Sequence, residues 1–211
     1  MPLSRGLVFG IGLGVILASG LLLADDVISL DVLPGSSISV GTQSFPLGDD
    51  PPTSAFNNVS VGDDGTVFGA QADISFVPID GMMAGFTFHI QMRPQSDLAG
   101  TYDRTGGSLT ASVAFDLKIT SNAPGFDNNN CIVPASAFSF STDDIGGSTF
   151  SGGQGIIVDN AFVVNAIPPG SCGSFFGTDC ARLINGNFGL PSPSGNNMGS
   201  LIIRMSPALI P

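Results

Sequence analysis

Two oxygen-rich segments carry the side chains of this sequence best suited to chemistry. Asp63 and Asp64 lie in the segment VGDDGT, and Asp127, Asn128 and Asn129 lie in GFDNNN. Carboxylate, amide and main-chain oxygens are the ligands that calcium takes, in sets of about six to eight. We therefore expect these residues as candidate calcium ligands, with calcium as the one candidate cofactor. The alternative is ordinary turn chemistry, because Asp and Asn side chains also bond the backbone of their own loops.

The inventory of reactive residues excludes several catalytic classes. The chain has no Glu, which removes H-E-x-x-H zinc proteases and glycosidases that use a Glu acid. It also has no G-x-S-x-G motif, and Lys118 follows Leu117 instead of the Gly of a phosphate-binding loop. The single histidine, His89, alternates with apolar residues and is expected on a solvent-facing strand surface. We expect no catalytic residue and no enzymatic activity.

Three cysteines indicate a disulfide in an oxidising compartment. Cys172 and Cys180 flank the segment GSFFGTD, and closing so short a loop stabilises the fold by roughly 2.5 kcal/mol. We expect this pair as the disulfide, which leaves Cys131 over. Pairing of Cys131 with either of the other two cysteines stays open. Structural zinc is not expected, because three Cys and one distant His lack the close paired spacing of zinc ligands.

The charge and the aromatic residues restrict the partners. A formal net charge of -11 disfavours nucleic acids and anionic membrane surfaces. Sugar-binding modules commonly stack Trp or Tyr on their ligand, whereas this chain has no Trp and only Tyr102. Carbohydrate stays an alternative partner, and the chain itself is the partner that we expect first.

The first 24 residues predict export. Arg5 is followed by the apolar run from Leu7 to Leu17, and Ala24 ends a small-residue site for signal peptidase. Two alternatives remain for residues 1–24: an uncleaved membrane anchor, since the run approaches the ~20 residues that span a bilayer, or a pilin-type helix exposed by cleavage after Gly6. All three alternatives predict a secreted, extracellular or cell-surface protein, with membrane contact only through this segment if it is uncleaved.

Beyond Asp25 the hydrophobic pattern has a period of two. In SLTASVAFDLKIT, residues 108–120, every second residue from Leu109 to Ile119 is apolar, which is typical of a half-buried strand. Segments with a similar or weaker alternation are 27–32, 36–40, 72–77, 85–92, 135–142, 155–158, 161–166 and 200–205. Clusters of Gly, Pro, Asn and Asp separate them and predict turns.

These strands predict an all-β fold. We expect a single antiparallel β-sandwich or jelly-roll-like domain over residues 25–211, with 171–211 as its least regular part. Long exposed helices are not expected, because Glu is absent and Lys118 is the only lysine. Hydrophobic residues at 43% are sufficient to fill one core of this size.

The function expected from these features is an exported structural or interaction protein. It would be a self-associating subunit of an extracellular fibre, surface layer or matrix, assembled by donation of strand 26–32 or 200–205 to a neighbour. The donated side chains would be Val27, Ile28, Leu30, Val32, Leu201, Ile202 and Ile203. The alternative is a secreted, calcium-assisted module that binds a carbohydrate or a peptide.

Overall fold

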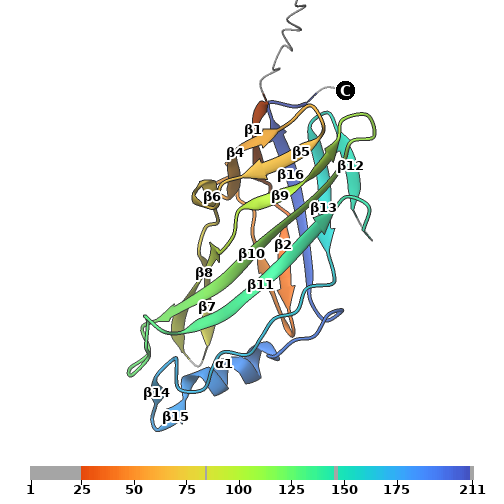
Figure 1. Cartoon of the computed structure of the whole chain (residues 1–211). Helices are drawn as coiled ribbons and strands as arrows, with labels where there is room; N and C mark the ends of the chain where they lie inside the picture. Colours follow the sequence, from red (N-terminus) through yellow and green to blue (C-terminus); the bar gives the residue numbers. More distant parts are fainter. Residues whose placement is uncertain (1–24, 84, 145–146, 210–211) are drawn as a thin grey trace, which may run out of the picture.

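The structure is a computed structural model that describes residues 25–83, 85–144 and 147–209 (Figure 1). The predicted signal segment, residues 1–24, lies outside the described residues. Within these three ranges no helix has the length and apolar character needed to cross a membrane.

Eight antiparallel strands close into a barrel. Around the barrel they are β13 (Gln154–Asp159), β11 (Ile132–Ser141), β10 (Ser108–Ser121), β9 (Leu98–Asp103), β5 (Thr66–Gly69), β4 (Ala55–Val61), β1 (Asp26–Val32) and β16 (Met198–Ser206). Pairing of β13 with β16, from Gln154 opposite Arg204 to Asp159 opposite Gly199, closes the ring. The closure leaves these strands with few free edges.

Further strands extend two walls of the barrel toward one end of the molecule (Figure 1). On one wall, β8 (Phe86–Pro94) pairs with the second half of β10, and β7 (Ile79–Met83) pairs with β8. On the other wall, β2 (Ser37–Val40) pairs with the start of β16, and β3 (Gln43–Pro46) pairs with β2. The helix α1 (Cys180–Phe188) lies at this end, which we call the α1 end.

Shorter elements complete the fold. The hairpin of β14 (Ser174–Phe175) and β15 (Thr178–Asp179) precedes α1 directly. The one-turn helix η1 (Gln71–Asp73) leads into β6 (Ile74–Ser75), which pairs with β4, and β12 (Ser148–Ser151) pairs with β13.

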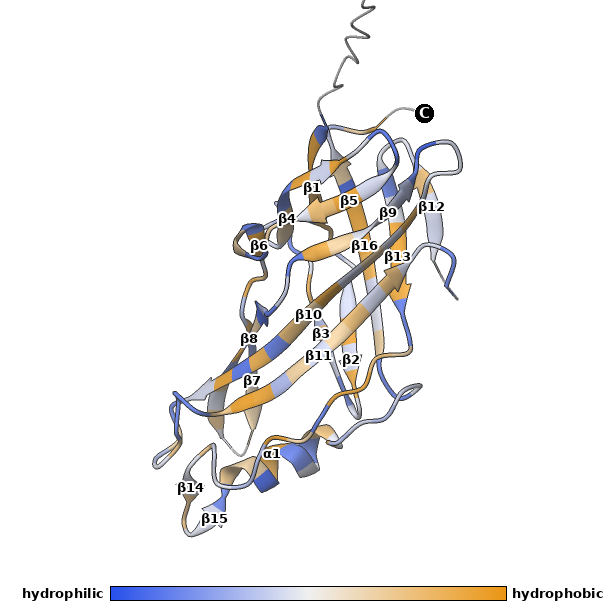
Figure 2. Cartoon of the chain, viewed as in Figure 1, coloured by the Kyte–Doolittle hydropathy of each residue, from blue (hydrophilic) through white to orange (hydrophobic). Residues whose placement is uncertain are grey.

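The core follows the alternation of the strands. In β10 and β11 buried positions alternate with more exposed ones, and Figure 2 shows the matching alternation of hydropathy along both strands. Phe115 is at the centre, with its ring centroid 5.3 Å from that of Phe76 and 5.7 Å from that of Phe138. Edge-to-face aromatic contacts of this kind fill a core without leaving voids.

The all-β prediction is confirmed, but the strands form a barrel in place of the expected sandwich or jelly roll. The physical reason is the β13–β16 ladder, which joins the two ends of what would otherwise be an open sheet. The expected strand at 161–166 is wrong, since that segment makes only an isolated bridge from Val164 to Ser192. Segment 72–77 forms only the two-residue strand β6, although Ile74 and Phe76 are buried.

The disulfide joins Cys131 to Cys172, so the expected Cys172–Cys180 pair is wrong. Main-chain hydrogen bonds from Asp127 N to Cys172 O (2.9 Å) and from Ser174 N to Gly125 O (3.1 Å) bring the loop after β10 beside Cys172. Cys180 instead begins α1 and is a buried free thiol. Nearness along the sequence favoured Cys172–Cys180, whereas the long-range hydrogen bonds place Cys172 beside Cys131.

The two strands expected to be donated lie inside the barrel of their own chain. β1 has β4 and β16 as neighbours, and β16 has β13 on one side with β1 and β2 along the other. Their apolar residues Ile28, Leu30, Val32, Leu201 and Ile203 are buried, whereas Val27 is exposed. Donation of either strand would therefore require the barrel to open.

Candidate functional site

An apolar cavity of about 260 Å³ lies at the α1 end, between α1, the turn region of β7 and β8, and the β14–β15 hairpin. We call it the outer cavity. Its walls include Phe86, Phe88, Phe126, Phe175, Leu183 and Ile184. Apolar concave sites with few polar groups are the usual binding sites for small molecules.

Local sequence signals build the helical wall of the outer cavity. The Asp179 side chain accepts a hydrogen bond from Ala181 N at 2.9 Å, which caps the first turn of α1. Gly189 ends the helix in the left-handed conformation at φ 69°. Between these caps Cys180, Ile184 and Phe188 repeat every four residues and are buried on one face.

Aromatic contacts fix the other walls. Phe88 packs against Phe126 with ring centroids 5.6 Å apart, and Phe86 packs against Phe175 at 5.1 Å. Phe86 and Phe88 come from alternate positions of β8, whereas Phe126 and Phe175 come from loops that the Cys131–Cys172 disulfide joins. The wall opposite β8 is therefore held by a covalent bond as well as by packing.

A second and smaller apolar cavity, of about 90 Å³, adjoins the first. We call it the inner cavity. It lies between β3 and β7 and reaches Phe45, Ile119 and Phe188. Met83, Phe88, Ile184 and Asn187 line both cavities. The two spaces are thus separated only by side chains that they share.

Gly81 contributes to the inner cavity by having no side chain. It alternates along β7 with Ile79 and Met83, both of which pack against the core. A Cβ atom built on Gly81 would meet no other atom within 4 Å. Gly81 is itself exposed, so this space opens from the inner cavity to solvent.

Neither cavity presents a charged side chain among the described residues that line it. The polar lining groups are the Cys180 thiol, the Gln43 amide and the Asn187 amide. Burial raises the pKa of the Cys180 thiol, and the neighbouring Asp179 carboxylate raises it further. The thiol accordingly stays neutral at neutral pH, and the lining has no counter-ion for a charged group.

Exposed apolar side chains surround this end of the molecule. Phe176 is 90% exposed and Met82 is 77% exposed, and Leu183 is partly exposed on α1. Phe176 has a φ of 46°, a left-handed conformation that is strained for a bulky residue. Phe176 and Gly177, at φ 76°, form the two-residue turn between β14 and β15, which usually contains Asn and Gly.

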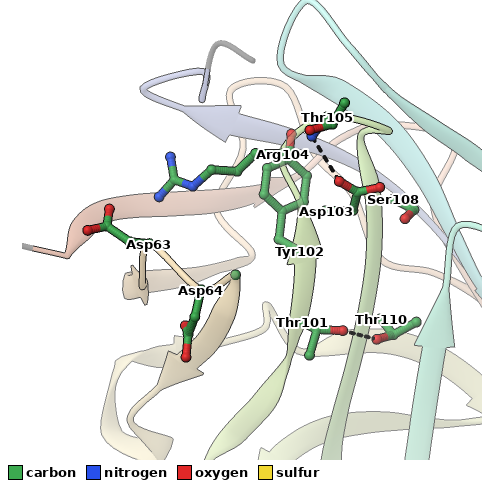
Figure 3. Close-up of a pocket in the computed structure, with 10 residues that line it drawn as sticks. Asp63, Asp64, Thr101, Tyr102, Asp103, Arg104, Thr105, Ser108 and Thr110 are labelled. Carbon is green, nitrogen blue, oxygen red and sulfur yellow. Dashed lines mark hydrogen bonds between the residues drawn. The ribbon is translucent and has the colours of Figure 1, made fainter.

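A larger but open polar hollow, of about 530 Å³, lies beside the β4–β5 turn and contains the calcium candidates Asp63 and Asp64 (Figure 3). Asp64 Oδ1 accepts a hydrogen bond from Thr66 N at 2.9 Å, which lowers the pKa of the Asp64 carboxyl. Arg104 forms an ion pair with Asp26 at 2.8 Å. The carboxylates of Asp63, Asp64 and Asp103 point in different directions in Figure 3.

The second group of calcium candidates has a turn role. Asp127 Oδ1 accepts hydrogen bonds from Asn129 N and Asn130 N, and Asp127 Oδ2 accepts one from the Asn130 amide. The Asn130 side chain and these backbone donors lower the pKa of Asp127. Asn128 Oδ1 accepts a hydrogen bond from Ser121 N at 2.7 Å.

The two groups of calcium candidates are not brought together. The hollow with Asp63 and Asp64 borders the start of β10, whereas Asp127 follows the end of β10. In the part of the chain that the structure describes, no cluster of three or more His, Cys, Asp or Glu has a geometry suited to a metal ion.

His89 is exposed on β8, as its place in the alternation predicts, and forms an ion pair with Asp80 of β7. This pair lies outside both cavities. The apolar site itself was not predicted from the sequence. Its visible signals were Phe86 and Phe88 on one strand face and the cap residues Asp179 and Gly189 around a short apolar repeat.

The fold and these cavities define a closed antiparallel β-barrel protein with a partly open apolar site at one end. Comparison of the chain with protein-family models, with curated proteins and with solved structures found no match.

Proposed function

We propose that this protein is an exported binding module that holds an apolar ligand in the outer cavity. The observation that carries the proposal is the cavity itself, which is bounded by aromatic and aliphatic side chains and has no charged lining residue among those described. Filling such a space with ligand removes apolar surface from water on both partners.

Two features support an exported location. The segment 1–24 has the sequence pattern of a signal peptide. The Cys131–Cys172 disulfide is of a kind that persists in oxidising compartments. This disulfide also joins the segments of Phe126 and Phe175, so it holds that wall of the outer cavity in place.

The test is titration with N-phenyl-naphthylamine, a neutral apolar dye whose fluorescence rises when it leaves water. The purified protein should enhance the fluorescence to saturation. Ala123→Phe places a ring in the outer cavity and should weaken binding at least tenfold, whereas Ala137→Phe on the exposed side of β11 should leave it unchanged. Absence of saturable binding, or equal affinity in both variants, would reject the proposal.

A second candidate function is self-association into a fibre, surface layer or matrix. It is supported by β3 and β7, which end their sheet paths, so that each presents one strand edge without a paired strand in the described chain. Exposed edges pair readily with other chains. Electron microscopy of the purified protein tests it: regular filaments or sheets that Met82→Pro on β7 abolishes support assembly, and monodisperse particles at high concentration contradict it.

A further inference from the structure

We propose that the ligand is a single unbranched hydrocarbon chain that runs through the outer cavity into the inner cavity and leaves an uncharged polar head at the mouth. This inference rests on the proposed function, because it names the chemical class that the same site takes. It is carried by the arrangement of the two cavities around Phe88 and Ile184.

Continuity of the two cavities is the first step. Met83, Phe88 and Ile184 line both spaces, so a ligand that displaces these side chains slightly passes from one space to the other. Methionine is unbranched and adaptable, and a Met at such a junction accommodates a ligand by changing rotamer.

The shape of the inner cavity is the second step. It has about 90 Å³ against about 260 Å³ for the outer cavity, and it ends among packed side chains. Phe45 and Phe188 meet there edge to face with ring centroids 5.7 Å apart, and Ile119 is fully buried. An apolar space of this small volume accepts the tip of a flexible chain and has no room for fused rings.

The position of Gly81 is the third step. The inner face of β7 lacks a side chain between Ile79 and Met83, and nothing occupies that volume within 4 Å of the Cβ position. Gly81 is exposed, so this space is open to solvent and borders the inner cavity. A ligand chain lying there would cover the apolar wall of the inner cavity that the missing side chain leaves bare.

The polar groups at the mouth are the fourth step. Asn187 lines both cavities and is exposed, and its side-chain amide can donate to and accept from a hydroxyl or an ester. Its main-chain oxygen accepts hydrogen bonds from Thr42 Oγ1 at 2.8 Å and from Gln43 Nε2 at 3.2 Å, which fix the residue. No cationic side chain lines the site among the described residues, so an uncharged head fits best.

The experiment measures displacement of N-phenyl-naphthylamine by straight-chain primary alcohols from hexanol to hexadecanol. Affinity should rise about fourfold for each added methylene while the chain is still entering the site, and then reach a plateau. Gly81→Leu fills the inner cavity and should move the plateau to shorter chains, by about as many carbons as the leucine side chain occupies. Phe45→Ala enlarges the inner cavity and should move the plateau to longer chains.

The control is Gly186→Leu on the exposed face of α1. A Cβ on Gly186 also meets no atom within 4 Å, but Gly186 lines neither cavity, whereas Gly81 lines the inner cavity. This variant should keep the plateau of the unmodified protein. Circular dichroism and urea unfolding verify that all three variants are folded before their plateaus are compared.

Three outcomes would overturn the inference: affinity independent of chain length, a sterol alcohol that binds as tightly as the best straight chain, or plateaus that coincide in Gly81→Leu and Gly186→Leu. In each of these cases the dye still binds, so the proposed function stands and only the ligand class is wrong. Failure of the unmodified protein to bind the dye would instead reject the proposed function.

Discussion

Phe175 and Phe176 are consecutive residues that face opposite sides of one cavity wall. Their ring centroids are 4.4 Å apart, yet Phe175 lines the outer cavity and packs on Phe86, whereas Phe176 is 90% exposed. The turn between β14 and β15 separates the two rings, because Phe176 adopts a positive φ. Phe176 therefore lowers the stability of the fold through its strained backbone and adds no packing to the core.

Phe175→Ala should lower the affinity for N-phenyl-naphthylamine about tenfold, because it removes an aromatic wall and its contact with Phe86. Phe176→Asn should leave the affinity unchanged and raise the free energy of unfolding by about 1 kcal/mol, because Asn tolerates the left-handed conformation. Dye titration and urea unfolding measure the two quantities. Equal loss of affinity in both variants would contradict the assigned orientations.

Removal of the disulfide should loosen the site as well as the fold. The double variant Cys131→Ser, Cys172→Ser opens a loop with a sequence separation of 41 residues, which should lower the free energy of unfolding by about 4 kcal/mol. Dye affinity should fall too, since Phe126 and Phe175 lie in the segments that the bond joins. Urea unfolding with and without reductant measures the change.

Cys180→Ala is the matched control for the disulfide prediction, because Cys180 is the buried free thiol. Reductant should lower the free energy of unfolding of Cys180→Ala by as much as it lowers that of the unmodified protein, because the Cys131–Cys172 bond is present in both. If reductant changed nothing in Cys180→Ala, the assigned pairing would be wrong.

The ion pair between Arg93 and Asp116 should contribute measurably to stability. Arg93 Nε and Nη2 donate to the two carboxylate oxygens of Asp116 at 2.8 and 2.7 Å, across paired positions of β8 and β10. Arg93→Met leaves the largely buried Asp116 carboxylate without its partner and should cost about 2 kcal/mol in urea unfolding. Asp31→Asn, which breaks the more exposed pair with Arg204, should cost less than 1 kcal/mol.

The loop after β10 should respond to acid through Asp127. Hydrogen bonds from Asn130 and Asn129 lower the pKa of Asp127 in the folded protein. Because the pKa is lower in the folded state, the ionised carboxylate stabilises the loop at every pH above the usual carboxyl pKa. This stabilisation is lost as the pH falls through the lowered pKa of the folded state. The protection of the Asn129 and Asn130 amides, measured as the exchange rate relative to the intrinsic rate at each pH, should therefore fall in acid.

Asp127→Asn should show the faster amide exchange already at neutral pH. Because the same oxygens accept the turn hydrogen bonds, calcium and a chelator should give the same melting temperature. A melting temperature that rises with calcium in the unmodified protein, and not in Asp127→Asn, would restore this loop as a calcium site.

The strands were the most predictable part of the fold. Strict alternation from Leu109 to Ile119 identified β10, and the alternations beginning at Phe86 and Val27 identified β8 and β1. The helix α1 and the strands β3, β4, β5, β7, β9 and β12 were missed, because short segments carry little periodic signal. Three of these strands, β4, β5 and β9, belong to the barrel.

By itself, the sequence determined that the chain is all-β, which residues face inward along each long strand, and that catalysis by several common mechanisms is ruled out. Only the tertiary structure decided that β13 meets β16, that Cys131 takes Cys172, and that β7, β8, α1 and the β14–β15 hairpin enclose an apolar cavity. The physical reason is that side-chain periodicity reports which face a residue occupies within one strand. Strand neighbours and cavities depend on contacts between distant segments, which no local pattern records.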